Sequence, residues 1–351
     1  MSADICNAVL DVAPDEIIRV VSAGSVKVVD YATAPLSPDY RNPMRRAMTG
    51  ALAGAAAGIA LLALLFLLNS KVADTKDLTQ SYTPPLLASV RRSKKDSEDP
   101  VTFMLGDDSP MEVVESFAKM RMNLLYTLVG KQHHTVVITS SISGEGKSTI
   151  SSNLAISCAL GGKRVLLIDG DMRRSSQKEI FKYRRSSMGL SDVLVGNCEW
   201  QQAVRATDWD TLNVLPAGQK PPNPAELLSS KEMQNLLEQL ERNYELVLID
   251  MPPINIVSDP LVLSSSVAGA LFVVRQNYSD HREVTKALKA AELTGMEILG
   301  FVFYGENLHQ GSYYYDRKYY RGYYNKYDTR KKSKQRSQNK KKKGEGDGNV
   351  D

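Results

Sequence analysis

The stretch TVVITSSISGEGKST, residues 135–149, decides the fold class. Its first six residues form an apolar, β-branched run typical of a buried strand, and SISGEGKST follows directly and opens a helical pattern. The Walker A form G-x-x-x-x-G-K-[ST] is matched at its end by Gly146, Lys147 and Ser148, whereas Ser141 replaces its first glycine. The sequence therefore predicts a phosphate-binding loop between a strand and a helix.

Each part of this loop has a task in binding ATP. Gly144 and Gly146 let backbone N–H groups approach phosphate oxygens, and the helix N-terminus adds partial positive charge. Lys147 can reach the β and γ phosphates, and the Ser148 hydroxyl can hold Mg²⁺. The predicted nucleotide-binding residues are Ser143, Gly144, Glu145, Gly146, Lys147, Ser148 and Thr149.

Carboxylates follow two further apolar runs. LLIDGDMR (166–173) places Asp169 and Asp171 at the end of one strand, and LVLIDMPP (246–253) places Asp250 at the end of another. Ligands of parallel α/β sheets bind beyond the carboxyl ends of the strands, so the three carboxylates should converge on the Mg²⁺ and γ-phosphate region. With Lys147 they are the predicted catalytic residues, and Asp171, Asp250 and Ser148 are the predicted metal residues.

The surrounding chain predicts an α/β fold. Apolar runs of strand length lie at 135–140, 164–169, 211–217, 245–250, 269–275 and 297–303, and helices are expected at 148–161, 224–242 and 280–294. Continuous apolar strands separated by helices indicate a mostly parallel sheet with helices on both faces, as in P-loop NTPases of the deviant-Walker type. In NPAE (223–226), Asn223 can cap a helix, Pro224 suits its first turn, and Glu226 can reach back to the cap amide.

Residues 47–68 form a different kind of segment. These 22 residues carry no charge, and at ~1.5 Å per residue they reach ~33 Å, enough for one membrane span. Flanking Arg and Lys residues do not decide the orientation. Because ATP is available in the cytoplasm, we expect residues 1–46 outside the cell membrane and the C-terminal part inside it. Residues 69–105, with Pro84-Pro85 and a charge run, predict a flexible juxtamembrane linker.

The positive charge is concentrated in a tail. Residues 330–343 carry nine of the 44 Lys and Arg residues, so the remainder has 35 against 40 Asp and Glu. The net charge of +4 therefore gives no general case for nucleic acid binding. The tail is either a solvated end or a segment that contacts lipid or an anionic polymer. The three cysteines share no metal or redox spacing and are predicted to be packing residues.

With these motifs in order, residues 106–308 resemble the bacterial tyrosine kinases of capsular and exopolysaccharide synthesis. TSSISGEGKST, LLIDGDMRR, LPAGQKPPNPAELLSS and LVLIDMPP look like the Walker A, Walker A′, mid-domain and Walker B segments of that family. The resemblance implies an ATP-dependent protein-tyrosine kinase with Mg²⁺. It implies partners in the polysaccharide copolymerase and export machinery, a tyrosine phosphatase as antagonist, and no nucleic acid.

The C-terminal region matches the family's autophosphorylation cluster. Eight of the chain's sixteen tyrosines lie within SYYYDRKYYRGYYNKYD, residues 312–328. The resemblance implies that neighbouring subunits phosphorylate this cluster in trans. The expected acceptors are Tyr313, Tyr314, Tyr315, Tyr319, Tyr320, Tyr323, Tyr324 and Tyr327.

Other parts of the chain depart from the family pattern. Residues 1–46 look like the end of a chain-length determinant protein, without the first membrane helix and long external domain that this family normally has before it. The subunit-contact helix usually reads E-x-x-R-x-x-R, and here Glu115 and Arg121 are present but Ala118 stands between them. Ring-like self-association is expected through that helix. Met251 replaces the threonine that usually follows Walker B, which should alter packing, or a hydrogen bond that supports the metal ligands, more than metal binding itself.

These observations give a domain scheme and a mechanism. The expected domains are an extracytoplasmic remnant (1–46), a transmembrane helix (47–68), a juxtamembrane linker (69–105), a P-loop kinase domain (106–308), and the tyrosine cluster with a basic tail (309–351). Asp169 is expected to accept or position the proton of the incoming tyrosine hydroxyl. Asp250 is expected to support the metal through water, and Asp171 to orient the metal or the acceptor.

Two rival interpretations stay open. A partitioning or positioning ATPase would share the fold and the loop, but such proteins carry a lysine five positions before the motif lysine, where Ile142 stands here. A non-catalytic regulator of polysaccharide export would bind nucleotide only. It would have no need for the complete set of Lys147, Ser148 and the three aspartates.

Overall fold

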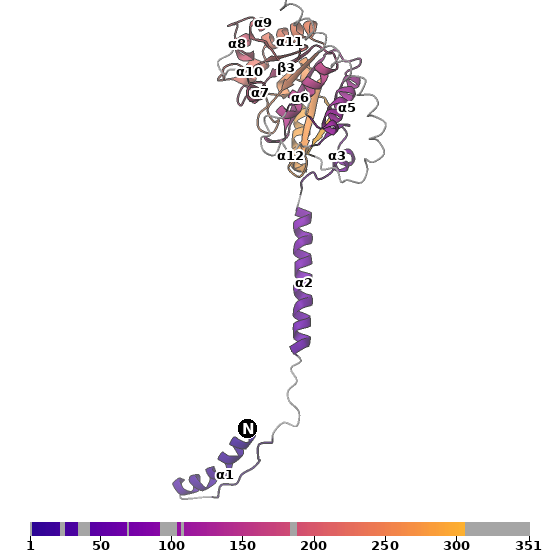
Figure 1. The fold of residues 1–351 in the computed structure, drawn as a ribbon. Helices are drawn as coiled ribbons and strands as arrows, with labels where there is room; N and C mark the ends of the chain where they lie inside the picture. The colour runs from indigo at the N-terminus through magenta and orange to yellow at the C-terminus, as the bar shows by residue number, and fades with distance from the viewer. Residues whose placement is uncertain are drawn as a thin grey trace, which may run out of the picture. The chain divides into compact units, whose positions relative to one another are not determined.

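The computed structural model describes residues 2–21, 25–33, 43–68, 70–91, 104–106, 109–182 and 188–305. The chain divides into two compact units, Met1–Asn69 and Ser70–Asp351, and each is described by itself. Figure 1 labels their elements. The first unit holds α1 (Ser2–Val21) and α2 (Pro43–Leu68), and the second holds the remaining helices and all described strands.

Helix α2 contains the predicted membrane segment. It begins four residues before the predicted start at 47, and its stretch Pro43–Leu64 is long and apolar enough to cross a membrane, with a mean hydropathy of 1.9. Its described side chains from Met44 to Leu64 are exposed, so this apolar helix has no protein core around it within its own unit. Helix α1 is joined to residues 25–33 by two hydrogen bonds between the Asn7 side chain and the backbone of Ala32, 2.8 and 2.9 Å long.

An eight-stranded sheet forms the centre of the second unit, in the order β1-β8-β7-β2-β6-β3-β5-β4. All neighbouring pairs are parallel except β4 and β5, which are antiparallel. The strands are β1 (Leu86–Val90), β2 (Thr135–Ser140), β3 (Val165–Asp169), β4 (Arg205–Ala206), β5 (Leu212–Leu215), β6 (Leu246–Asp250), β7 (Gly269–Arg275) and β8 (Ile298–Tyr304). This confirms the predicted mostly parallel α/β fold.

The central strands are apolar on both faces because both faces are covered. In β2, Val137 packs into one core cluster, and Val136 and Ile138 pack into the other. All three side chains are fully buried, and each such burial contributes roughly 1.5–3 kcal/mol to folding. A strand with a solvent face would alternate apolar and polar residues, which TVVITS does not.

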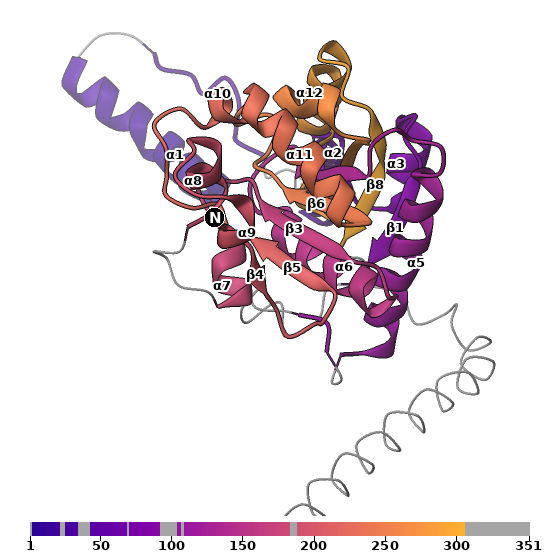
Figure 2. The same ribbon diagram turned by 90° about the horizontal axis from the view of Figure 1, so that it is seen from above.

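Helices cover the two faces of the sheet (Figure 2). The apolar residues of α5 (Met111–Thr127) and α6 (Lys147–Leu160) bury one face. On the other face, the core is completed by α8 (Leu190–Leu194), α10 (Pro224–Leu228), α11 (Lys231–Asn243), η1 (Leu261–Ser266) and α12 (His281–Leu293). Two short helices, α7 (Gln177–Phe181) and α9 (Trp200–Ala203), lie in the connections between strands.

The single helix predicted for 224–242 is wrong, because two helices form there. Helix α10 ends at Leu228 and α11 begins at Lys231, where the Ser230 hydroxyl accepts a hydrogen bond from the Met233 N–H at 3.2 Å. A serine at this position satisfies the N–H groups of a new first turn and so favours a restart. Asn223 also differs from the prediction: its side chain donates to the Glu226 carboxylate and does not cap the backbone.

The flexible linker predicted for 69–105 is wrong for its described residues 70–91, and the described Leu105 near its end is also buried. Residues Thr75–Ser81 form α3, and β1 adds to the sheet beside β8. Val72 and Leu78 are fully buried. The strand was not predicted from the sequence because LLASV is only five residues long and lies between Pro84-Pro85 and the charge run.

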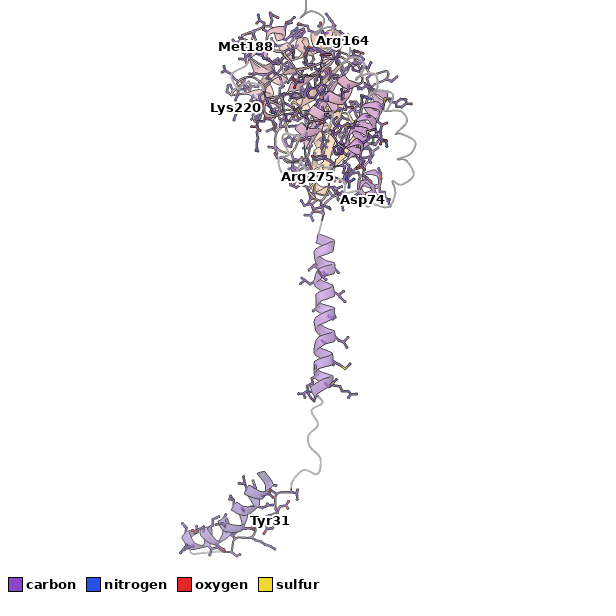
Figure 3. All side chains as sticks on the ribbon, viewed as in Figure 1. Tyr31, Asp74, Arg164, Met188, Lys220 and Arg275 are labelled. Atoms are coloured by element: carbon purple, nitrogen blue, oxygen red, sulfur yellow. The ribbon has the colours of Figure 1, made fainter. Side chains whose placement is uncertain are left out.

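Residues 70–73 are also bonded to the turn between β7 and α12. The Val72 N–H donates to the Ser279 carbonyl at 2.9 Å, and the Val72 carbonyl accepts from the Asn277 N–H at 2.8 Å. The Ser70 carbonyl accepts from the His281 N–H at 2.9 Å. This turn lies at the carboxyl end of β7, and Figure 3 shows Arg275 there, at the opposite end of the unit from Arg164, which precedes β3.

Candidate active site

The phosphate loop has the predicted strand–loop–helix setting. It leaves β2 at Ser140 and enters α6 at Lys147, with Gly146 as the N-cap residue. Gly144 and Gly146 have φ values of +84° and +91°, a backbone region in which any residue with a Cβ atom is strained. The N–H groups of a helix's first turn have no carbonyl partner within that helix, so this loop presents donors to an anion.

The Glu145 side chain has a role within the loop that the sequence did not predict. Its side chain is fully buried and accepts hydrogen bonds from the Ser141 hydroxyl and the Ile142 N–H, both at 2.8 Å, and from the Ser279 hydroxyl. These contacts turn the carboxylate away from the phosphate position. Glu145 therefore braces the loop from within, and only its backbone is available to a nucleotide.

The turn after β7 supports the loop from a distant part of the sequence. Arg275 Nη1 donates to the Gly144 carbonyl at 2.7 Å, and the Tyr278 hydroxyl donates to the Ser143 carbonyl at 3.0 Å. The Arg275 guanidinium lies over the Tyr278 ring, 4.8 Å from its centroid. Sequence reasoning missed these residues, although a charged side chain at the end of a buried strand was a signal.

The predicted carboxylates meet at the carboxyl ends of adjacent strands. Asp169 ends β3 and Asp250 ends β6, and the two residues are register partners in the parallel pair. Both are buried. Asp169 Oδ2 accepts a hydrogen bond from the Ser175 hydroxyl at 2.5 Å. Burial raises the pKa of Asp250, and the Ser148 hydroxyl, Lys147 and the Gln177 amide act in the opposite direction.

Asp171 lies in the loop after β3 and is partly exposed. Its Oδ1 accepts hydrogen bonds from the N–H groups of Arg173 at 3.2 Å and Arg174 at 2.8 Å. Burial raises its pKa, while these N–H groups and Lys147 oppose the shift. Lys147 is the cation that faces this group of acids. Burial lowers the pKa of Lys147, and Asp250, Glu145 and Asp171 partly offset this effect.

Two further contacts hold the loop after β3. Arg173 forms two hydrogen bonds to the buried Asp259 carboxylate, 2.9 and 3.1 Å long. Gln177, the first residue of α7, is fully buried and donates to Asp250 Oδ2 at 2.7 Å. Sequence reasoning missed both Asp259 and Gln177, and no local motif marks either one.

Comparison with known proteins fits this geometry. The family described as an AAA domain matches residues 133–276, which include the phosphate loop and all three aspartates. The tyrosine-protein kinase YwqD of Bacillus subtilis is 36% identical over 215 residues, which are 61% of this chain and 87% of that protein. The chain belongs to the bacterial tyrosine-protein kinases.

One further relative and one solved structure are also similar to this kinase. The tyrosine-protein kinase ptk of Acinetobacter johnsonii is 29% identical over 298 residues, 81% of this chain but only 40% of that protein. The kinase domain of the Escherichia coli tyrosine kinase ETK has a TM-score of 0.61 at 27% identity and covers 70% of this chain and 99% of that one. The resemblance to the capsular and exopolysaccharide kinases is thereby confirmed, as are the P-loop fold and the enzyme class.

The residues of the kinase site fit a hydrated Mg²⁺ ion. Two buried oxygens, Asp250 Oδ1 and Gln177 Oε1, accept no hydrogen bond from the described part of the chain. Mg²⁺ usually keeps several waters and is bound through one or two carboxylates plus substrate phosphates. In the described ranges, no group of three or more His, Cys, Asp or Glu side chains is arranged to hold a metal without such help. Ser148 and the predicted carboxylates supply the hard oxygen donors that Mg²⁺ prefers.

Met251 acts through packing, as predicted. It is fully buried, and a Cβ added at Gly170 would collide with its sulfur atom. The side chain therefore fills the space beneath the loop that begins at Gly170, between the ends of β3 and β6.

The predicted subunit-contact residues are engaged within the kinase itself. Arg121 Nη1 donates to the Ser157 carbonyl near the end of α6, where a cation also complements the helix dipole. Glu115 forms an ion pair with Lys119 one turn further along α5, at 3.1 Å. Both contacts lie within one chain, and self-association through this helix stays a prediction. The eight predicted acceptor tyrosines lie outside the described residues.

Proposed function

We propose that this kinase transfers the γ-phosphate of ATP to tyrosines of its own C-terminal cluster, from one copy to another. The observation that carries this proposal is the register pairing of Asp169 with Asp250 beside Lys147 and the phosphate loop. A site for water attack needs one activated water, whereas two adjacent carboxylates allow one to serve the metal and the other to serve an acceptor hydroxyl. The tyrosines of a neighbour's C-terminal cluster are the acceptors that the sequence supplies.

The roles of the residues follow from their positions. Lys147 would bind the β and γ phosphates, and the Ser148 hydroxyl would hold Mg²⁺. When bound, Mg²⁺ neutralises charge that develops on the phosphate oxygens. Asp250 would support the metal through water, and Asp171 would orient the metal or the acceptor. Asp169 would take the tyrosine proton. Because the transition state is loose, most of the rate enhancement would come from positioning and charge neutralisation.

The membrane location and the partners complete the proposal. Helix α2 would cross the cell membrane once, with residues 1–46 outside and the kinase in the cytoplasm, where ATP is available. The copies would self-associate, and α5 remains the proposed contact. The partners would be the polysaccharide copolymerase and export machinery, with a tyrosine phosphatase as antagonist. Each phosphate on the tyrosine cluster would add a charge of about −1.5 to −2. Several phosphates would reverse the sign of this basic segment and so drive the copies apart.

The test is phosphorylation of the full chain in detergent micelles with γ-labelled ATP. Label on tyrosine, lost in Lys147→Met and reduced at least ~100-fold in Asp169→Asn, supports the proposal. Release of free phosphate without labelled tyrosine would instead identify a switch ATPase. Near-normal labelling of either variant would remove the role assigned to that residue.

A mixing experiment tests transfer between copies. The donor is an active chain in which all eight cluster tyrosines are changed to phenylalanine. The acceptor is the Lys147→Met chain, which keeps its tyrosines. Label on the acceptor chain supports transfer in trans. If the acceptor chain stays unlabelled while the wild-type chain, assayed by itself, becomes labelled, transfer occurs within one copy.

A further inference from the structure

Gln177 connects three parts of the active site through one buried amide. Its Nε2 lies 2.7 Å from Asp250 Oδ2, 2.9 Å from the Ser151 hydroxyl oxygen and 3.3 Å from the Ser148 carbonyl. Asp250 ends β6, Ser148 and Ser151 lie in the first turns of α6, and Gln177 begins α7. One side chain therefore joins the end of β6 and the start of α7 to the helix that follows the phosphate loop.

The orientation of this amide is fixed by its neighbours. The carboxylate of Asp250 and the carbonyl of Ser148 can only accept hydrogen bonds, so Nε2 has to face them. The opposite orientation would place Oε1 against a carboxylate oxygen. Oε1 consequently points to the other side, where it is buried and accepts no hydrogen bond from the described part of the chain.

One oxygen of the neighbouring Asp250 carboxylate is likewise buried without a hydrogen-bond donor among the described residues. This oxygen is Asp250 Oδ1, whereas Asp250 Oδ2 is held by the Gln177 amide. Buried polar oxygens in proteins are normally satisfied by protein or by ordered water. Two unsatisfied acceptors on side chains that are bonded to each other suit the water molecules of a hydrated divalent cation, because each such water carries two hydrogens to donate.

We propose that Gln177 is a positioning residue for Mg²⁺, an inference that rests on the metal site proposed above. Its Nε2 fixes the Asp250 carboxylate, and its Oε1 accepts a hydrogen bond from a water of the metal ion. Glutamine is required here because it presents a donor to Asp250 and an acceptor to water. Glutamate would place a second negative charge at ~2.7 Å from the first, where like charges repel strongly.

The test measures the affinity for a fluorescent ADP analogue, with EDTA and across a Mg²⁺ titration, using the full chain in detergent micelles. For Gln177→Met, we expect the apparent affinity for Mg²⁺ to fall ~10–100-fold, because loss of a group that orients a metal ligand typically has this effect. Affinity in EDTA should stay within about twofold. In kinase assays the KM for Mg²⁺ should rise, with a smaller change in kcat at saturating Mg²⁺. An unchanged Mg²⁺ titration would overturn the inference.

Glu179→Gln is the matched control. Residue 179 lies on the same short helix and its side chain is exposed, so a substitution of similar size there should leave the Mg²⁺ titration unchanged. If Glu179→Gln lowers the Mg²⁺ affinity as much as Gln177→Met does, the effect belongs to α7 as a whole and the inference fails.

A paired substitution keeps the inference testable if single variants fold poorly. Gln177→Glu should lower the thermal unfolding temperature because two carboxylates then meet. Adding Asp250→Asn restores one amide and one carboxylate, so the double variant should recover at least half of the lost stability. No recovery would show that the two side chains do not interact as described. Wild-type chain that shows Mg²⁺-dependent ADP binding but labels no tyrosine would refute the proposed function and leave this inference standing.

Discussion

The phosphate loop and the loop after β3 lie at the same end of the sheet but are held in different ways. The first loop is fixed by a buried carboxylate within it, Glu145, and by the side chains of Arg275 and Tyr278, which donate hydrogen bonds to backbone carbonyls of the loop. The second is held by the Arg173–Asp259 ion pair at its rim and by Gln177 where α7 begins. The first loop is thus held by its own buried carboxylate and by donors to its backbone carbonyls, and the second is held by side chains that reach the carboxylates of Asp259 and Asp250.

The largest effect is expected for Glu145→Ala. Two hydroxyls and one N–H group would lose a buried acceptor, so the free energy of unfolding should fall by about 3 kcal/mol. Urea unfolding and ADP affinity measure the two consequences. Glu145→Gln keeps the shape and one acceptor oxygen, and should fall between Glu145→Ala and the wild type. If Glu145→Ala changes neither property, the internal brace does not exist.

The next effect is expected for Gly146→Ala. A Cβ there would lie 2.6 Å from Cδ1 of the Tyr304 ring, at a φ of +91°, so stability should fall by roughly 1–3 kcal/mol and ADP affinity with it. Gly130→Ala is the control, because Gly130 has a φ of +81° and no atom within 4 Å of an added Cβ. Equal losses of stability in the two variants would show that backbone strain alone is responsible and that the Tyr304 ring is not.

A smaller loss is expected for Arg173→Ala in the second loop. The arginine side chain is 40% exposed, so solvent screens the pair, but Asp259 would be left buried. Stability should fall by about 1–2 kcal/mol. Phosphotransfer should fall more than ADP affinity, because the acidic loop is disturbed and the phosphate loop is not. A larger loss of ADP affinity than of transfer rate would contradict the distinction between the two loops.

The smallest effect is expected for Asp280→Asn, where residues 70–71 are bonded to the turn that braces the phosphate loop. Asp280 Oδ2 accepts from the Ser70 hydroxyl at 2.5 Å and lies 3.9 Å from Lys71 Nζ. The substitution should cost about 1 kcal/mol at neutral pH. It keeps a residue that can cap α12, so only the contacts of the charge are removed.

The same variant makes a prediction for pH. Burial alone would raise the pKa of Asp280, but the Ser70 hydroxyl, the Arg282 N–H and the Lys71 charge together hold it below its usual value. The ionised form is therefore the one stabilised by folding. Its contribution is complete above the ordinary pKa of about 3.9 and is lost as pH falls through the lower, folded-state pKa. The stability difference between wild type and Asp280→Asn should be constant from pH 6 to 8 and shrink below about pH 4. A difference that persists at pH 2 would assign it to packing.

Sequence patterns predicted much of this protein's structure wherever the signal lies within a few neighbouring residues. The apolar runs predicted six of the strands, and the motif residues Asp169 and Asp250 lie side by side at the ends of β3 and β6. Prediction was weaker where a short element depends on its neighbours. The strand Leu86–Val90 was missed because an edge strand of five residues is defined by the partner to which it bonds, here β8.

The sequence by itself determined the strand–loop–helix motif, the acids at the strand ends, a helix long and apolar enough to cross a membrane, and hence the resemblance to the family. Each of these rests on residues within a few positions of one another, whose spacing fixes their geometry. Only the tertiary structure decided that Glu145 faces inward, that Arg121 contacts α6, and that Gln177 and Asp250 share hydrogen bonds. Those contacts join residues 36 or 73 positions apart, or depend on which side of a loop is buried, and no local pattern encodes either.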